Sequence, residues 1–227
     1  MIEPLHFSYP SQYCNIFYVS CLHFGHDRDF IYKPRGFTSV QEHDDTLVKR
    51  WNDSISNRDI VHSIGDTIFG QGSEKRLMEY FRKLNFWKLY LSPGNHFSGW
   101  HQLYKKVLNE KYRSLGLPDN TEIYPLEYTL YEGKTIYFMP NLYEIYVGKQ
   151  AMVLCHYPIA SWHGQGKGSY LICGHTHRNY PPTRPESTNG KMLDVCVENF
   201  GKPVSYSEVE KIMNTKSILV VDHHGDK

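Results

Sequence analysis

Short apolar runs alternate with amphipathic stretches through the first half of the chain. Runs rich in β-branched and aromatic residues predict strands at 15–20, 59–64 and 87–91. Between them, residues 38–55 and 73–84 repeat apolar side chains at helical spacing, and a further helix is expected within 99–115. This strand–helix alternation predicts parallel strands whose C-terminal ends meet at one edge of a sheet.

After residue 115 the helical spacing gives way to short stretches of alternating polarity. Strands are expected at 122–131, 135–139, 143–147 and 151–154, joined by hairpin-like links and therefore antiparallel. Later strands are predicted at 170–173, 191–197 and 217–221. Capping boxes predict helix starts at Ser39 with Glu42 and at Ser205 with Glu208. The whole pattern predicts one mixed α/β (α+β) domain over residues 1–227 that holds two sheets.

Composition gives no general reason to expect a nucleic-acid or membrane partner. The 227 residues are 40% hydrophobic and 22% charged, with a formal net charge of +1. The start of the chain lacks the features of a signal peptide, and no apolar run approaches the length of a membrane span. The 5 cysteines have no CxxC spacing, and four of them stand in or beside apolar runs, as free thiols do in a reducing compartment. We therefore expect a cytoplasmic protein.

Side chains that bind metals stand at the ends of the predicted strands. Gly174-His175-Thr176-His177 follows the run at 170–173, and alternate residues of an extended segment point to one side, so His175 and His177 can serve one target. Other predicted strand ends carry His23, Asp66, Asn95 and His156. Imidazole, carboxylate and amide groups suit a divalent metal. If these ends share one edge, the cluster could hold two metals with Asp66 bridging them.

These motifs resemble the calcineurin-like metallophosphoesterases. That family carries D-x-H, G-D-x-x-x-G, G-N-H-[DE], a lone His and G-H-x-H in this order. The matching segments are Cys21-Leu22-His23, Gly65-Asp66-Thr67-Ile68-Phe69-Gly70, Gly94-Asn95-His96-Phe97, His156 and Gly174-His175-Thr176-His177. Further segments look like small single-domain bacterial and phage members: His23-Phe24-Gly25-His26, Trp51-Asn52 and His156-Tyr157-Pro158-Ile159. The resemblance implies a four-layer αββα sandwich with two mixed β-sheets.

The resemblance also implies a role for each matching residue. One metal would be bound by His23, Asp66 and His177, and the other by Asp66, Asn95, His156 and His175. His96, Asp66 and Asn95 would be catalytic, with His96 and Asn95 contacting the phosphate. The implied cofactors are two divalent ions (Mn, Fe or Zn). The implied reaction is hydrolysis of a phosphodiester or phosphomonoester by a metal-bridging hydroxide, on a modest-sized substrate for which a nucleotide is one candidate.

Two positions depart from the family pattern. Cys21 stands where the family has a ligand aspartate; it is either a thiolate ligand, favouring zinc or iron over magnesium, or a small buried residue that leaves the first metal weak or absent. Phe97 replaces the acidic neighbour of His96, whose orientation would then depend on another group, such as Asp27 or Asp45.

Three further residues have less defined expectations. His26 either reaches the phosphate or has a surface role, and Arg35 could contact an anionic substrate. Asp194 could orient one of the ligand histidines.

The sequence leaves two alternatives to a dinuclear enzyme. One is a scaffold that kept the fold, lost catalysis and binds a partner through the old site; Cys21 and Phe97 favour it, whereas the intact ligand set disfavours it. The other is a mononuclear zinc hydrolase that uses only the second site, which the number of bound metals would distinguish. No G-D-x-x-D-R-G segment is present, which disfavours a phosphoprotein substrate.

Overall fold

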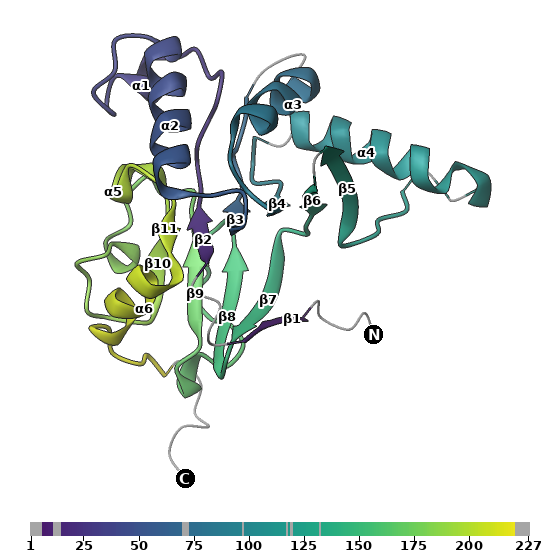
Figure 1. Ribbon diagram of the computed structural model, residues 1–227. Helices are drawn as coiled ribbons and strands as arrows, with labels where there is room; N and C mark the ends of the chain where they lie inside the picture. Colours follow the sequence, from purple (N-terminus) through teal and green to yellow (C-terminus); the bar gives the residue numbers. More distant parts are fainter. Residues whose placement is uncertain are drawn as a thin grey trace.

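A computed structural model describes residues 6–10, 15–69, 73–96, 98–116, 118, 120–131 and 133–220. Over these residues the chain has a mixed α/β fold that combines two mixed sheets with several helices (Figure 1). Among the described residues, no helix is both long enough and apolar enough to cross a bilayer.

The larger sheet, here called the large sheet, has the strand order β11-β2-β3-β4-β6-β5. Its strands are β2 (Ile16–Val19), β3 (Ile60–Ile64), β4 (Lys88–Ser92), β5 (Leu126–Tyr131), β6 (Lys134–Phe138) and β11 (Val204–Ser205). Strands β2, β3, β4 and β6 are parallel, while β11 and β5 pair antiparallel at the two edges. The parallel strands predicted from the first half of the chain are confirmed.

The small sheet has the strand order β1-β7-β8-β9-β10. Its strands are β1 (His6–Tyr9), β7 (Leu142–Val147), β8 (Gln150–Cys155), β9 (Tyr170–Cys173) and β10 (Met192–Asp194). The expected antiparallel hairpins are confirmed for β5–β6 and β7–β8. The remaining neighbours in the small sheet (β1–β7, β8–β9 and β9–β10) are parallel, so this half of the chain is less antiparallel than expected.

The two sheets pack face to face through one apolar cluster. Tyr18 and Ile64 reach into it from the large sheet, and Ile145, Leu154 and Ile172 from the small sheet. Strands β3 and β9 are buried along their whole length. This is why β9 appears in the sequence as a continuous apolar run, whereas β3 is apolar apart from His62 and Ser63. Burial of this apolar surface holds the sheets together and fixes where their strands end relative to one another.

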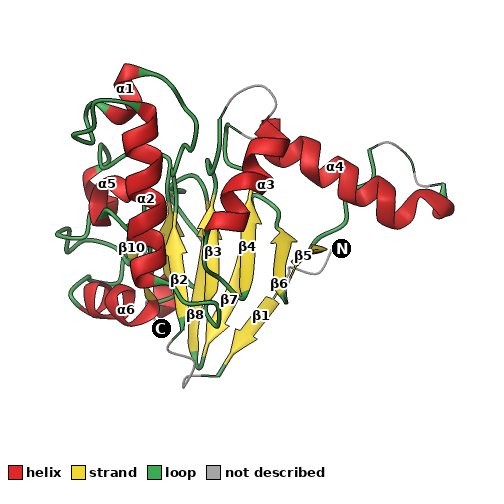
Figure 2. Ribbon diagram, turned by 45° about the horizontal axis from the view of Figure 1, so that its top comes forward, coloured by secondary structure: helices red, strands yellow, loops and turns green. Residues whose placement is uncertain are grey.

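Three helices cover the outer face of the large sheet (Figure 2): α2 (Val40–Ser54), α3 (Ser73–Lys83) and α4 (Ser98–Tyr112). Trp51, Phe81 and Leu103 pack from these helices against sheet residues such as Leu89 and Phe138. All three helices were predicted from the sequence, α2 and α3 from their apolar spacing.

Helix starts are determined by local capping. Ser39 caps α2 by accepting from the backbone N–H of Glu42 at 3.2 Å, but the Glu42 carboxylate bonds to Thr38 and not to Ser39, so this capping box is only half formed. The second capping box, Ser205 with Glu208, is complete at the start of α6 (Tyr206–Asn214).

The outer face of the small sheet differs from the sandwich that the resemblance implies. Its apolar cluster consists of Val153, Leu171 and Met192 with Trp162 and Ile159 from the loop that follows β8. Within the described residues no α-helix contributes to this cluster, whereas α6 packs into the cluster between the sheets. A loop therefore takes the place expected for a fourth, helical layer.

Other elements were not predicted from the sequence. They are β1, β11, α1 (Asp29–Tyr32), α5 (Val197–Phe200) and the 3₁₀ turns η1 (Arg113–Leu115), η2 (Gln165–Lys167) and η3 (Pro181–Thr183). The strand expected over 191–197 is shorter, because α5 begins at Val197.

The last predicted strand, at 217–221, is wrong over its described residues. Residues 217–220 form no strand, and their apolar side chains are largely exposed. Ile218 and Leu219 lie against Gly168 and Gly190 instead of a neighbouring strand. Residue 221 lies outside the described residues.

Candidate metal centre

The candidate ligands follow the C-terminal ends of strands in both sheets. Cys21 and His23 follow β2, Asp66 follows β3, Asn95 and His96 follow β4, His156 follows β8, and His175 and His177 follow β9. Strands β2, β8 and β9 point toward the same end of the molecule (Figure 1). Because the sheets are packed together, residues far apart in the sequence meet at this edge.

Among the described residues, three overlapping sets have their ligand atoms within 4.8 Å of one another. They are Cys21 with His23 and His177, Cys21 with Asp66 and His156, and His23 with Asp66 and His96. Each set contains nitrogen ligands together with sulfur or oxygen, and each could hold a metal ion. Cys21, His23 and Asp66 occur in more than one set, so the sets adjoin in a single centre.

Asn95 connects the two ligand histidines of the small sheet. Its Oδ1 lies 2.9 Å from Nε2 of His156 and 2.9 Å from Nδ1 of His175. His156 also approaches Asp66, with 3.2 Å between Nε2 and Oδ2. The four residues expected to bind the second metal are therefore linked in a chain of contacts, Asp66–His156–Asn95–His175.

The hydrogen bonds of His156 show that this cluster suits a cation. Its Nδ1 lies 2.8 Å from the carbonyl oxygen of Ile64, so Nδ1 carries a hydrogen and donates it. In the neutral ring, Nε2 then presents a lone pair to two acceptor oxygens, Oδ1 of Asn95 and Oδ2 of Asp66. Three converging acceptors repel one another unless a proton or a metal ion lies between them. Burial lowers the pKa of His156, but the hydrogen bond to Asp66 raises it above its ordinary value overall.

His177 is oriented by a carboxylate that sequence reasoning missed. Its Nδ1 lies 2.6 Å from Oε1 of Glu198, the second residue of α5. The opposite nitrogen, Nε2, therefore faces the centre, 3.3 Å from Nε2 of His23. A carboxylate bonded to the far nitrogen of a ligand histidine is a common partner of protein metal sites. Despite burial, hydrogen bonds with Cys21 and Glu198 raise the pKa of His177 to about 10.

Asp194, the residue expected to orient a histidine ring, has another role. Its carboxylate accepts the Thr176 hydroxyl and, at 2.7 Å, the backbone N–H of Cys196. It therefore stabilises the turn between His175 and His177 and contacts neither ring.

Cys21 has the surroundings of a thiolate. The side chain is fully buried, and its sulfur accepts the backbone N–H of His175 at 3.2 Å. Burial raises the pKa of a thiol, but hydrogen bonds from Cys196, His177 and His23 bring that of Cys21 well below its ordinary value. These contacts favour the thiolate-ligand alternative over the small buried residue.

Five of the candidate ligands have a left-handed backbone. The φ angles are 56° at Cys21, 53° at His23, 53° at Asp66, 70° at His175 and 46° at His177. Such angles cost non-glycine residues on the order of 1–3 kcal/mol each and concentrate at functional sites. Gly94 adds a close approach: its φ is 74°, and a Cβ there would collide with the carboxylate of Asp66. The left-handed residues therefore coincide with the candidate ligands at the strand ends.

His96 lies beside the first ligand group. Its backbone N–H donates to Oδ1 of Asp66 at 2.8 Å, and its half-buried ring lies with its centroid 5.4 Å from that of His23. Burial lowers the pKa of His96. Phe97 and Gly70 lie outside the described residues. Asp45 does not orient His96, because it is exposed on α2 and accepts from Gln41.

His26 is buried next to the centre and is not a surface residue. Its ring stacks on Phe69 with 3.7 Å between centroids, and its Nδ1 lies 3.4 Å from Nδ1 of His23. Burial, with His23 and His96 nearby, lowers the pKa of His26 to about 4. The neutral ring of His26 therefore contacts His23 through the ring nitrogen Nδ1 of each residue.

Arg35 is part of the internal support of the centre. Its side chain is 5% exposed, and it bonds to Oε1 of Glu198 through Nε at 2.8 Å and Nη2 at 2.6 Å. It also donates to the carbonyl oxygens of Leu22 and Cys21. Its guanidinium is therefore engaged within the protein, and contact with an anionic substrate stays a prediction.

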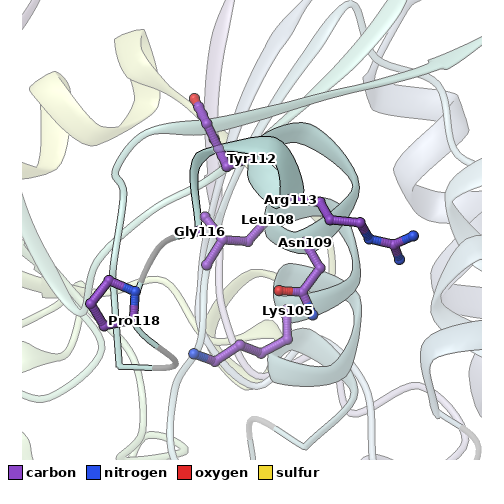
Figure 3. Close-up of a pocket in the computed structure, with 7 residues that line it drawn as sticks. All are labelled: Lys105, Leu108, Asn109, Tyr112, Arg113, Gly116 and Pro118. Carbon is purple, nitrogen blue, oxygen red and sulfur yellow. The ribbon is translucent and has the colours of Figure 1, made fainter.

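A separate surface pocket of about 510 Å³ lies along α4 (Figure 3). It is lined by Lys105, Leu108, Asn109, Tyr112, Arg113, Gly116 and Pro118. None of these is a candidate ligand, so the pocket and the metal centre are different places on the molecule.

Comparisons with known proteins give information on the fold of the chain. No family model matches it. It is similar to the uncharacterized protein MJ1445 of Methanocaldococcus jannaschii, with 27% identity over 209 residues that cover 90% of this chain and 94% of that protein. Among solved structures, it matches the protein of unknown function AQ665 from Aquifex aeolicus with a TM-score of 0.52 and 16% identity, over 87% of this chain and 98% of the other. At this identity, the structural match supports the mixed α/β fold alone.

Proposed function

We propose that this chain is a calcineurin-like, metal-dependent phosphoesterase with two divalent metal ions. The observation that carries the proposal is the convergence of Asp66, Asn95 and His156, whose facing acceptor atoms need a proton or a metal ion between them. The order of the motifs along the chain supports the same assignment. On this proposal the two packed sheets form a variant of the family's sandwich in which a loop replaces part of the outer helical layer.

The donor atoms divide into two sets. Cys21, His23, Asp66 and His177 would bind the first metal, and Asp66, Asn95, His156 and His175 the second. Sulfur and nitrogen ligands give the first set a preference for zinc or iron, while the oxygen ligands of the second also suit manganese. The bound ions would supply Lewis acidity, which lowers the pKa of coordinated water and offsets charge on phosphoryl oxygens.

The protein residues would position and protonate the substrate. Asp66 lies between the sets and holds the backbone of His96 through Oδ1. The ring of His96 is half-buried and can donate a proton to the leaving oxygen. Asn95, next to it, would contact the phosphate as well as a metal. The substrate would be a modest-sized phosphodiester or phosphomonoester, with a nucleotide as one candidate.

We further propose a cytoplasmic location. Four buried cysteines are free thiols: Cys21, Cys155, Cys173 and Cys196. Free buried thiols, including the proposed ligand Cys21, suit a reducing compartment.

The direct test supplies metal-stripped protein with manganese or zinc and measures hydrolysis of bis(p-nitrophenyl) phosphate and p-nitrophenyl phosphate. We expect metal-dependent turnover that is lost in His96→Ala and kept in His163→Ala, since His163 is an exposed histidine outside the centre. Bound metal is counted in parallel. Two metals without turnover on either ester would favour the binding scaffold, and turnover with one metal would favour the mononuclear hydrolase.

A further inference from the structure

A row of buried polar side chains leads from α2 to the metal centre. Asp44 Oδ1 lies 2.7 Å from His43 Nδ1, and His43 Nε2 lies 2.7 Å from Arg35 Nη1. Arg35 then bonds to Glu198 at 2.6 and 2.8 Å, and Glu198 to Nδ1 of His177 at 2.6 Å. His43 and Asp44 are buried, although they lie on a helix whose neighbouring residues are exposed.

Every hydrogen-bond direction along this row is determined. A guanidinium has donors only, so Arg35 donates to Nε2 of His43 and His43 donates from Nδ1 to Asp44. The Glu198 carboxylate accepts from Arg35 and from Nδ1 of His177. His177 is thereby held with Nε2 toward the centre, as metal binding through that nitrogen requires.

Both ends of the row are anchored to the surrounding fold. The second carboxylate oxygen of Asp44 accepts the Tyr80 hydroxyl from α3 and, at 2.8 Å, the backbone N–H of Gly25. Nearer the metal centre, Arg35 donates to the carbonyl oxygen of Cys21 at 2.8 Å. The row therefore contacts both the ring of His177 and the backbone of Cys21, on two sides of the first ligand set.

Stability alone gives a poor reason for this arrangement. Desolvating an arginine and a glutamate is costly, and apolar residues of similar volume often serve a core equally well. Because the buried Arg35–Glu198 ion pair bonds to the candidate ligand His177, a role in positioning that ligand explains it better.

We infer that Asp44, His43, Arg35 and Glu198 form a relay that positions the first metal site selectively. The inference rests on the proposed function only in taking His177 and Cys21 as ligands. Among the described residues, no hydrogen bond or ion pair joins His156, Asn95 or His175 to this relay; the ring of His156 is held by the carbonyl oxygen of Ile64 instead. Weakening the relay should therefore affect one metal and spare the other.

The test is a metal titration without substrate, using zinc or cobalt against a competing chelator, with the count of bound metal and the cobalt absorption spectrum as readouts. We expect Glu198→Gln to weaken the first site about 10-fold and Glu198→Ala about 100-fold, within the range known for such partners of metal ligands. Arg35→Lys should weaken the same site, since an ammonium cannot reproduce the forked contacts. The second site should keep its affinity.

Tyr9→Phe is the matched control. It removes a buried hydroxyl, 3.3 Å from His62, outside the relay, so it lowers stability without touching the ligands. Circular dichroism confirms that each variant is folded. Equal weakening of both sites, or no change in the Glu198 variants, overturns the relay. If the wild type binds two metals, the Glu198 variants lose affinity at the first site only, and no phosphoester is cleaved, the relay is supported and the proposed phosphoesterase activity is rejected. Wild-type protein that binds no metal rejects both the relay and the proposed activity.

Discussion

Nε2 of His156 lies 3.2 Å from Oδ2 of Asp66, which joins the end of a small-sheet strand to the end of a large-sheet strand. Asp66 also lies 3.9 Å from Nε2 of His23, so one carboxylate contacts both ligand sets. Burial raises the pKa of this carboxyl, but the hydrogen bond with His156 lowers it overall. Asp66 is therefore an anion at the boundary of the two proposed sites.

Asp66→Asn should lower both metal content and turnover. We expect kcat/KM to fall by at least about 100-fold, because changing even a partner of a metal ligand costs about 10- to 100-fold. Steady-state kinetics with metal analysis measures the change. Asp59→Asn is the control, since Asp59 is also buried but accepts from the backbone of Ser56. An Asp66→Asn protein that keeps two metals and full turnover would remove Asp66 from the centre.

Cys21→Ser tests the departure from the family pattern. Cobalt bound by a thiolate gives a sulfur-to-metal charge-transfer band in the near ultraviolet, and this band should be present in the wild type and absent in the variant. Serine should also reduce the preference for zinc over manganese, because it replaces a soft ligand with oxygen. Cys196→Ser, which changes the neighbouring thiol, should keep the band. A wild-type cobalt spectrum without it would show that Cys21 only fills space.

Gly94→Ala should destabilise the protein and disturb the centre together. The new Cβ would meet Asp66 at a backbone φ of 74°, so strain and collision add. Gly116→Ala is the matched control: its φ is 57°, and a Cβ there meets nothing within 4 Å. Urea unfolding should show a loss of roughly 1 kcal/mol for the control and a larger loss for Gly94→Ala. Equal losses, with unchanged metal content, would mean that Asp66 moves aside freely.

The sequence predicted the central elements because burial leaves a simple pattern. Strand β9 is a continuous apolar run, β3 is apolar apart from His62 and Ser63, and α2 carries Leu47 and Trp51 at helical spacing. Strands β1 and β11 lie at sheet edges and contain only 4 and 2 residues, too short for a periodic signal. The run at 217–220 shows the reverse case: its apolar residues predict a strand, but in the structure these residues pair with no strand.

The candidate ligands were found because His, Asp and Asn beside Gly at strand ends are an unusual combination. Their support was not found, because it depends on tertiary contacts. Glu198 is 21 positions from His177, on a short helix whose sequence has no metal-site pattern. His43 and Asp44 lie among polar residues of α2, which are ordinarily expected to be exposed. The sequence therefore points to Asp45, as a partner of His96, and not to its buried neighbour Asp44. Burial distinguishes Asp44 from Asp45, and only the fold determines burial.

His62 provides a prediction on pH that is independent of the metal centre. Its ring lies between Tyr18 and Tyr90 in the cluster between the sheets, with Nδ1 2.9 Å from the Tyr143 hydroxyl. Burial lowers its pKa to about 3, while a histidine in the unfolded chain titrates near about 6.5. Between these values the unfolded chain binds a proton that the folded protein does not, so acidification favours unfolding. The stability from His62 is complete above pH about 6.5 and falls by up to about 1.4 kcal/mol per pH unit as pH drops toward 3.

Urea unfolding of the wild type and His62→Phe at pH 7 and pH 5 measures this contribution. At pH 7 the variant should be less stable, because the hydroxyls of Tyr9 and Tyr143 lose their partner. From pH 7 to pH 5, however, it should lose less stability than the wild type, since phenylalanine binds no proton in either state. His163→Ala, at an exposed position, should follow the wild-type curve. Parallel losses in wild type and His62→Phe would show that His62 accepts a proton inside the folded core, and that the surrounding tyrosine hydroxyls stabilise its charge.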